Sequence, residues 1–354
     1  MNNIEGIKQA LVERGCSAIL ITSPVNRLFA TGFSSSAGIL LVTQAGTWFF
    51  ADSRYIEAAK TALPDAQVKL ITQGSPYETI KAVLAEQGIK SVGFEDGSVT
   101  YSEYLNLKNK LGVELQPMQT LLSDLRAVKS RDDLESIKKA QRISEKAFAE
   151  ILPMIGTGIT EKQLATELIY RMLKHGADDK SFDPIIVSGT RTSLPHGVPG
   201  DHKIGKGFIT IDFGARLGGW CSDTTRTLCV GAPSDEMVKV YETVLAAQEA
   251  GIATVRAGIT GHEIDAAGRA VITGAGFGEY FGHGFGHGIG LEVHEPPRSA
   301  PSYDNVIPAG AVISAEPGIY LPGKFGVRIE DLLYVTDDGC ENITNITKEL
   351  VVID

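Results

Sequence analysis

The sequence predicts a two-domain α/β protein, in which an α/β domain over residues 1–124 precedes an α+β domain over residues 125–354 that contains two similar halves. The first observation is size and composition: 354 residues, 43% of them hydrophobic, can bury two cores and are too apolar for a disordered chain. The second is an alternation of short apolar runs with amphipathic stretches up to residue 122. The third is a pattern of two helices and a strand pair that then occurs twice.

Strands and helices alternate in the first domain. Short apolar runs predict strands at 17–22, 37–42, 47–52, 66–71 and 90–95. Amphipathic stretches between them predict helices at 3–14, 53–63, 75–87 and 100–111. Such alternation is typical of a compact α/β domain.

The second domain begins with a long helix that is predicted after Ser130, because Ser is a good N-cap and acidic residues follow it. Thr160 and Gln163 form a capping box for a second helix. The later elements are predicted as helices at 161–175, 235–255 and 261–273 and strands at 183–188, 208–213, 221–230, 311–316 and 327–336. The long helices begin 104 residues apart, near 131 and 235, which predicts two related halves with a crevice suited to a site.

Four carboxylates interrupt apolar strand patterns in these halves: Asp212, Asp223, Glu316 and Glu330. A turn centred on Leu217-Gly218 would place the two aspartates directly opposite each other on one face of a hairpin. Glu316 and Glu330 lie 14 residues apart and form a second acidic pair. Glu316 follows Asp212 by 104 residues, the same offset as between the long helices. We therefore expect the two acidic pairs to meet at the axis between the halves.

A buried cluster of four negative charges needs positive charge, because buried unpaired carboxylates are very costly. Two divalent cations balance four carboxylates, which predicts a two-metal site with bridging carboxylates. The alternative is pairing with Arg226 and Arg328, but two arginines cannot neutralise four acids.

Three histidines occur in the glycine-rich segment 281–297, which reads FGHGFGHGIGLEVHEPP. Its glycines let the backbone approach another surface closely. Among His283, His287 and His294, one imidazole could bind a metal while the others donate hydrogen bonds or shuttle protons. His196 lies in the turn-like segment Leu-Pro-His-Gly.

Composition argues against other classes of protein. The 33 basic and 43 acidic residues give a net charge of −10, which disfavours binding to nucleic acid. No apolar run approaches the ~20 residues of a membrane-spanning helix, and the first residues lack the apolar core of a signal peptide. The four cysteines form no CxxC motif, and HExxH and GxSxG are absent. We expect a cytoplasmic enzyme with neither a nucleic-acid nor a membrane partner.

These residues resemble the dinuclear pita-bread metallopeptidases, a family that includes methionine aminopeptidase, aminopeptidase P and prolidase. The family's metal ligands are matched, in order, by Asp212, Asp223, His287, Glu316 and Glu330. The run HGIGLEVHEPP at 287–297 is specific to the proline peptidases, and residues 1–124 look like their N-terminal domain. The resemblance implies a pita-bread fold with a pseudo-two-fold repeat for residues 125–354, and hydrolysis of Xaa-Pro bonds.

The resemblance also implies two divalent metal ions per chain, with Mn²⁺ favoured and Co²⁺ or Zn²⁺ as alternatives. Asp212 would chelate one ion, and His287 and Glu316 would bind the other. Asp223 and Glu330 would bridge them, so that a water between the ions attacks as hydroxide.

Roles for the remaining residues follow from the same resemblance. Glu316 would shuttle the proton, and His294 would hydrogen-bond the developing oxyanion. His283 and His196 would line the site. Tyr320 and Arg328, beside two ligands, would orient the carboxylates and the metal-bound water and contact the substrate.

The substrate is expected to be a small peptide with proline in second position. Prolidases have an arginine where this sequence has Arg298, and its guanidinium could clamp the free carboxylate of a dipeptide. An Xaa-Pro dipeptidase is therefore expected, and an Xaa-Pro aminopeptidase acting on longer peptides is the alternative, in which Arg298 is a solvated surface residue. Two remoter alternatives, a metal-free creatinase-like hydrolase and a non-enzymatic binding protein, belong to branches that lack the ligand set. The resemblance also implies a homodimer.

Overall fold

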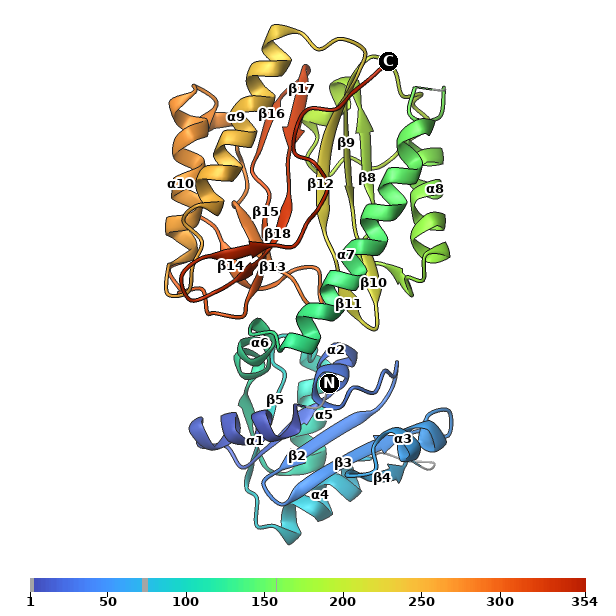
Figure 1. Ribbon diagram of the computed structural model, residues 1–354. Helices are drawn as coiled ribbons and strands as arrows, with labels where there is room; N and C mark the ends of the chain where they lie inside the picture. Colours follow the sequence, from blue (N-terminus) through green and yellow to red (C-terminus); the bar gives the residue numbers. More distant parts are fainter. Residues whose placement is uncertain (1–2, 72–75, 157) are drawn as a thin grey trace. The chain divides into compact units, whose positions relative to one another are not determined.

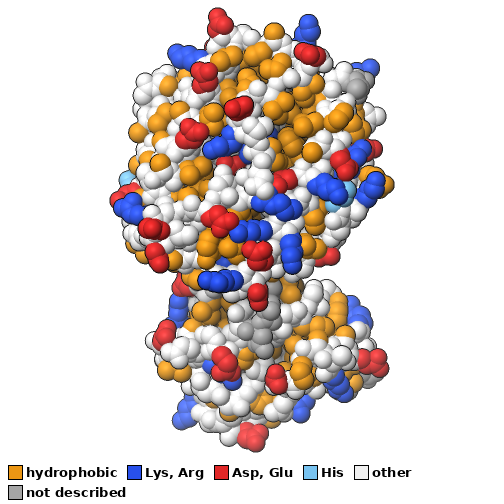
Figure 2. Space-filling view, in the orientation of Figure 1, with side chains coloured by type: hydrophobic (Ala, Val, Ile, Leu, Met, Phe, Trp, Pro, Cys, Tyr) orange, Lys and Arg blue, Asp and Glu red, His pale blue; other side chains and the backbone are white. Residues whose placement is uncertain are grey.

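The computed structural model describes residues 3–71, 76–156 and 158–354 (Figure 1). The chain divides into two compact units, Met1–Arg126 and Ala127–Asp354. Both contain helices packed on sheets, so the predicted α/β class is confirmed. On the face shown in Figure 2, basic and acidic side chains are interspersed. Within the described ranges, no helix has the length and apolar character needed to cross a bilayer.

The first unit contains a six-stranded sheet of order β4-β3-β2-β1-β5-β6. Its strands are β1 (Ala18–Ile21), β2 (Ile39–Thr43), β3 (Gly46–Ala51), β4 (Gln67–Leu70), β5 (Ser91–Phe94) and β6 (Glu114–Pro117). Its helices are α1 (Ile4–Glu13), α2 (Pro24–Thr31), α3 (Ile56–Ala62), α4 (Tyr77–Glu86), α5 (Tyr101–Leu111) and α6 (Gln119–Ala127). Its core is built from buried residues such as Leu20, Leu41, Trp48, Leu84 and Val92.

The strands and helices predicted for this unit are confirmed to within about three residues. The predicted start of one helix at residue 75 lies outside the described residues. The prediction missed α2, β6 and α6. The capping signals of α2 were present, since Ser23 accepts a hydrogen bond from Asn26 N and Gly32 ends the helix with a φ of 72°. By contrast, β6 is polar and partly exposed, so it has no apolar run to reveal it.

In the second unit, helices flank strands from both halves (Figure 1). The first half contains α7 (Arg131–Ile151), η1 (Leu152–Met154), α8 (Glu161–Lys174), β7 (Asp179–Lys180), β8 (Ile185–Ser188), η2 (Gly189–Ser193), β9 (Gly207–Phe213), β10 (Ala215–Leu217), β11 (Trp220–Cys221) and β12 (Thr224–Val230). The second half contains α9 (Asp235–Ile252), α10 (Gly261–Gly274), η3 (Gly278–Tyr280), β13 (Gly286–Gly288), β14 (Glu295–Ser299), β15 (Val312–Ala315), β16 (Gly318–Leu321), β17 (Phe325–Arg328), β18 (Asp331–Val335), β19 (Cys340–Asn342) and β20 (Val352–Ile353).

The helices begin where the capping residues predict. Side chains of Ser130, Thr160, Ser234 and Thr260 accept hydrogen bonds from backbone amides at the starts of α7, α8, α9 and α10. The long helices α7 and α9 begin 104 residues apart, at Arg131 and Asp235. The second helices α8 and α10 begin 100 residues apart, at Glu161 and Gly261, so the repeat is not a constant offset.

The hairpin that carries the two aspartates differs from the prediction in its register. Asp212 faces Thr225, not Asp223, in the antiparallel pairing of β9 with β12. The turn is centred on Gly218-Gly219, whose φ values of 58° and 89° suit a tight hairpin that only glycine adopts easily. The predicted centre was therefore wrong by one residue. Asp223 lies in the gap between β11 and β12.

The second acidic pair also lies at strand breaks. Glu316 follows β15 and Glu330 precedes β18, next to the paired residues Ala315 and Asp331. In the following hairpin, Gly318 pairs with Arg328. Asp223, Glu316 and Glu330 thus lie where regular strand pairing is interrupted, whereas Asp212 lies within β9 and is paired on both sides.

Candidate active site

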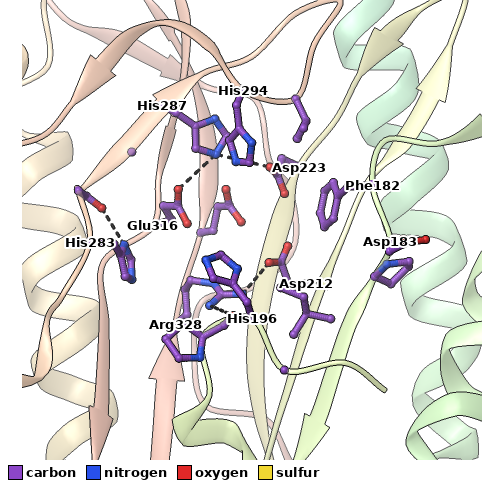
Figure 3. Close-up of a pocket in the computed structure, with 18 of the residues that line it drawn as sticks. Phe182, Asp183, His196, Asp212, Asp223, His283, His287, His294, Glu316 and Arg328 are labelled. Atoms are coloured by element: carbon purple, nitrogen blue, oxygen red, sulfur yellow. Dashed lines mark hydrogen bonds and ion pairs between the residues drawn. The ribbon is translucent and has the colours of Figure 1, made fainter. Parts of the chain in front are cut away.

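A cavity of about 810 Å³ opens in the second unit (Figure 3). It is lined by all five predicted metal ligands, together with His196, His283, His294, Arg298 and Arg328. An apolar wall, which includes Phe182, Ile185, Pro195 and Val198, completes it. Of the predicted site residues, Tyr320 is absent from the lining: its buried side chain lies behind His283 and Arg328.

Arg328 ties one acid from each half together. Its Nη2 donates to Asp212 Oδ2 at 2.6 Å, and its Nε donates to Thr225 Oγ1 at 3.1 Å. Thr225 Oγ1 in turn donates to Glu330 Oε2 at 2.8 Å. Arg226 points elsewhere, to Asp331 Oδ1 at 2.7 Å and to backbone carbonyls. Arg328 thus pairs directly with one of the four acids, and Arg226 pairs with Asp331 instead, so the alternative of two arginine partners is wrong.

Three of these acids keep an oxygen atom that has no partner among the described residues. Asp212 Oδ1, Asp223 Oδ1 and Glu330 Oε1 are buried and accept no hydrogen bond from the described residues. A buried carboxylate oxygen without a donor or a cation costs free energy. These oxygens therefore have the environment expected of metal ligands.

The pKa values of the acids reflect this crowding. Burial and neighbouring carboxylates hold the pKa values of Asp223 and Glu330 well above the ordinary range. Burial also raises the pKa of Asp212, although Arg328 offsets part of the effect. Burial acts to raise the pKa of Glu316 as well, but the hydrogen bond and charge of His287 outweigh it and lower that pKa to about 2.

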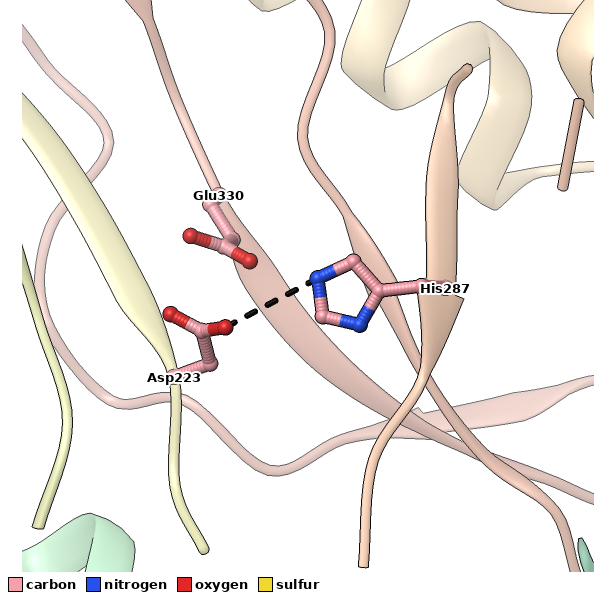
Figure 4. Close-up of side chains that lie close together, drawn as sticks. All are labelled: Asp223, His287 and Glu330. Carbon is pink, nitrogen blue, oxygen red and sulfur yellow. Dashed lines mark ion pairs between the residues drawn. The ribbon is translucent and has the colours of Figure 1, made fainter. Parts of the chain in front are cut away.

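His287 faces the acids with one ring nitrogen. Its Nε2 lies 3.2 Å from Glu316 Oε1 and 3.7 Å from Asp223 Oδ2, while Nδ1 lies 3.1 Å from Gly288 O and donates to it. Figure 4 shows His287, Asp223 and Glu330 close together. One possible ligand atom from each lies within 4.8 Å of the others. The His294 ring packs edge to face on His287, with centroids 4.2 Å apart.

A hydrogen-bonded chain connects Arg328 to His283. Arg328 Nη1 donates to the Tyr320 hydroxyl at 3.0 Å, and that hydroxyl lies 2.9 Å from His283 Nε2. His283 Nδ1 lies 2.8 Å from Gly284 O, so Nδ1 carries the hydrogen and Nε2 accepts from Tyr320. Because burial lowers the pKa of His283, its imidazole is neutral at pH 7.

Family models match both parts of the chain. The model of metallopeptidase family M24 matches residues 135–337, and the model of the creatinase/prolidase N-terminal domain matches residues 3–128. The chain belongs to metallopeptidase family M24. The resemblance inferred from the sequence is thereby confirmed, and the chain is a peptidase with the pita-bread fold.

Relatives of this M24 peptidase match over nearly their whole length. The chain is 40% identical over 352 residues to the uncharacterized peptidase YqhT of Bacillus subtilis, with 99% of each chain covered. It is 35% identical to the Xaa-Pro dipeptidase of Pyrococcus furiosus, over 98% of this chain and 99% of that one. A solved Xaa-Pro dipeptidase from Bacillus anthracis superposes with a TM-score of 0.95 at 41% identity, with 99% of both chains covered. An X-Pro aminopeptidase from Thermotoga maritima gives 0.91 at 36% identity, with 98% and 100% covered.

Membership of the M24 family implies divalent metal ions, and the residues of this peptidase fit them. Carboxylate oxygens and one imidazole nitrogen converge, and three of the oxygens have no other partner among the described side chains. Mixed oxygen and nitrogen donors suit Mn²⁺, Co²⁺ or Zn²⁺.

Sequence reasoning missed two hydroxyl residues that hold the acids. Thr225 bonds both Arg328 and Glu330. Ser314 Oγ accepts from His287 N at 3.0 Å and donates to Glu316 Oε1 at 3.3 Å. Each lies two residues from a predicted ligand, which is the spacing at which side chains of an extended segment point to the same side. The period-two spacing was the available signal.

Proposed function

We propose that this M24 peptidase is an Xaa-Pro dipeptidase that uses two divalent metal ions, with Mn²⁺ as the favoured metal. The observation that carries the proposal is the convergence of five donor side chains on one cavity, three of them with buried oxygens unsatisfied by the described residues. Relatives named Xaa-Pro dipeptidase, at 35% and 36% identity over 98% of this chain, support the substrate class.

The ligands divide according to their position. Asp212, which lies beside Arg328, would hold one ion, and His287 with Glu316 would hold the other. Asp223 and Glu330 would be shared by the two sites. When bound, the ions would lower the pKa of a water molecule and polarise the scissile carbonyl.

The chain's own residues supply proton transfer and hydrogen bonds. Burial and the neighbouring His287 lower the pKa of His294, so its imidazole is neutral at pH 7 and can donate an N–H toward the developing oxyanion. Glu316 accepts the proton of the attacking water and passes it on. His283 and His196 line the cavity beside the substrate.

Arg298 decides between dipeptides and longer peptides. It pairs with His287 in the β13–β14 ladder, lines the cavity and is exposed, whereas Arg328 is engaged by Asp212. An exposed guanidinium beside the ligands is placed to clamp the carboxylate that follows proline in a dipeptide.

Removal of the Arg298 side chain tests this assignment. Arg298→Ala should lower kcat/KM for an Xaa-Pro dipeptide at least tenfold, because a lost charge-assisted bond costs ~1.5–3 kcal/mol. An Xaa-Pro-Yaa tripeptide offers only a neutral amide at that point, so its hydrolysis should change little. Equal losses on both substrates would instead favour an Xaa-Pro aminopeptidase, the activity named for the Thermotoga maritima structure.

Two further expectations belong with this proposal. All four cysteines, each of which the structure describes, are free thiols, which supports a reducing cytoplasmic environment. The homodimer stays a prediction that light scattering coupled to gel filtration can test.

A further inference from the structure

Two buried carboxylates outside the predicted ligand set hold the segments that carry His196 and His283. Glu161 is the first residue of α8 and is 0% exposed, and Asp265 on α10 is 1% exposed. These helices correspond in the two halves, although Asp265 lies one turn further along its helix. Neither acid lines the cavity, so any influence on substrate must pass through the segments they bind.

Glu161 binds both ends of the segment that carries His196. Its Oε1 accepts from Ser188 N at 2.8 Å, and its Oε2 accepts from Gly200 N at 3.1 Å. Arg191 donates from Nε to Glu161 Oε2 at 3.2 Å and from Nη2 to Val198 O at 2.6 Å, which ties the segment across its middle. One ion pair therefore closes residues 188–200 into a loop.

Asp265 does the same for the segment that carries His283. Its Oδ1 accepts from Phe285 N at 2.9 Å, and its Oδ2 accepts from Arg269 Nε at 2.7 Å. Arg269 Nη1 donates to Phe281 O at 2.9 Å, and Nη2 donates to His283 O at 2.7 Å. The guanidinium also lies 4.1 Å from the centre of the Phe281 ring. The backbone on both sides of His283 is thus fixed by one ion pair.

The two histidines reach the cavity from these separate segments (Figure 3). Buried ion pairs rarely repay their desolvation in stability, but they can fix one arrangement of the backbone. Substrate-positioning side chains must be held to within about an ångström, because small displacements cost large factors in rate. We propose that the pairs Glu161–Arg191 and Asp265–Arg269 are positioning pairs, which set His196 and His283 respectively for substrate. This inference rests on the proposed function.

Double-mutant cycles test whether each ion pair affects hydrolysis through the histidine in its own segment. Glu161→Gln and Asp265→Asn should each lower kcat/KM for an Xaa-Pro dipeptide by roughly 10- to 100-fold, with two metal ions per chain retained. In a His196→Ala background, Glu161→Gln should have less than about a twofold further effect, whereas in a His283→Ala background its full effect should persist. Asp265→Asn should have less than about a twofold further effect in the His283→Ala background and its full effect in the His196→Ala background.

The control is Glu150→Gln, because Glu150 pairs with Arg171 and His175 in the same half and does not line the cavity. It should leave kcat/KM within about twofold in every background. Multiplicative effects of Glu161→Gln or Asp265→Asn in both histidine backgrounds, or loss of metal, would overturn the positioning role. If either acid variant fails to fold, Arg191→Met or Arg269→Met replaces it in the same cycle, since these partners are more exposed, at 28% and 27% of their side chains.

A measurement without substrate separates this inference from the proposed function. In amide hydrogen exchange, Glu161→Gln should speed exchange within residues 188–200 and leave residues 281–286 unchanged, and Asp265→Asn should do the reverse. If one acid variant speeds exchange in both segments, or in neither, the claim that each ion pair fixes only its own segment is refuted. This holds even if no Xaa-Pro peptide is hydrolysed. If each acid variant speeds exchange only in its own segment but the wild-type enzyme hydrolyses no Xaa-Pro peptide, the proposed substrate alone is refuted.

Discussion

His287 and His294 have ring centroids 4.2 Å apart, yet they contact different groups. His287 Nε2 points at Glu316 and Asp223, whereas His294 is exposed at the cavity edge. Two neighbouring imidazoles can therefore serve different purposes: one as a ligand, and the other as a hydrogen-bond donor to the substrate.

Alanine substitutions should separate these purposes. His287→Ala should remove at least one metal ion and most activity. His294→Ala should retain both ions and lower kcat by roughly 10²–10³, the range for one lost oxyanion donor. Elemental analysis and steady-state kinetics of the purified variants provide the readout. Metal loss in His294→Ala, or full metal content in His287→Ala, would contradict the assignment.

At the scale of the element, β13 needs its glycines to fit between β14 and β15. A Cβ on Gly286 would lie 2.0 Å from Ser314 O, a backbone atom that cannot move aside without shifting β15. Gly286 adjoins His287, and Ser314 bonds both His287 and Glu316. A methyl group at this position would therefore push two predicted ligands apart.

Gly286→Ala should destabilise the protein by about 1–3 kcal/mol, as overpacking does, and lower its metal content. Gly282→Ala is the matched control in the same glycine-rich segment, because its Cβ would meet nothing within 4 Å and its φ is not positive. Urea unfolding and metal analysis should distinguish the two variants. Equal stability and metal content in the two variants would mean that the close approach of β13 to β15 does not constrain the metal site.

At the scale of the whole molecule, the buried acids couple stability to pH and to metal. Asp223 and Glu330 have pKa values well above those of an unfolded chain, which are about 4, so the folded state binds their protons more tightly. Their contribution to the free energy of unfolding therefore falls as pH rises above about 4. His287, whose pKa is raised, acts in the same direction, whereas the lowered pKa values of His283 and His294 oppose it up to about pH 6.5. The lowered pKa of Glu316 affects stability only below about pH 4.

We expect metal-free protein to melt at a lower temperature at pH 8 than at pH 5. Saturating Mn²⁺ should raise the melting temperature more at pH 8 than at pH 5, because metal binds the deprotonated carboxylates and competes with protons at low pH. Differential scanning calorimetry at both pH values, with and without metal, measures the two increments. An equal rise in melting temperature with Mn²⁺ at pH 5 and pH 8 would show that these acids do not release protons when metal binds.

Local sequence determined the helices of the second unit and the candidate ligand set. Capping residues and apolar periodicity act over a few neighbours, so Ser130 or Thr160 starts a helix whatever lies across the fold. Only the tertiary structure decided that Asp212 faces Thr225, since two glycines of positive φ set the turn. It also decided that Arg328 binds Asp212, 116 residues away, while Glu161 closes a loop at Gly200. Such contacts depend on which surfaces pack together, and a buried charge takes whichever partner that packing brings within reach.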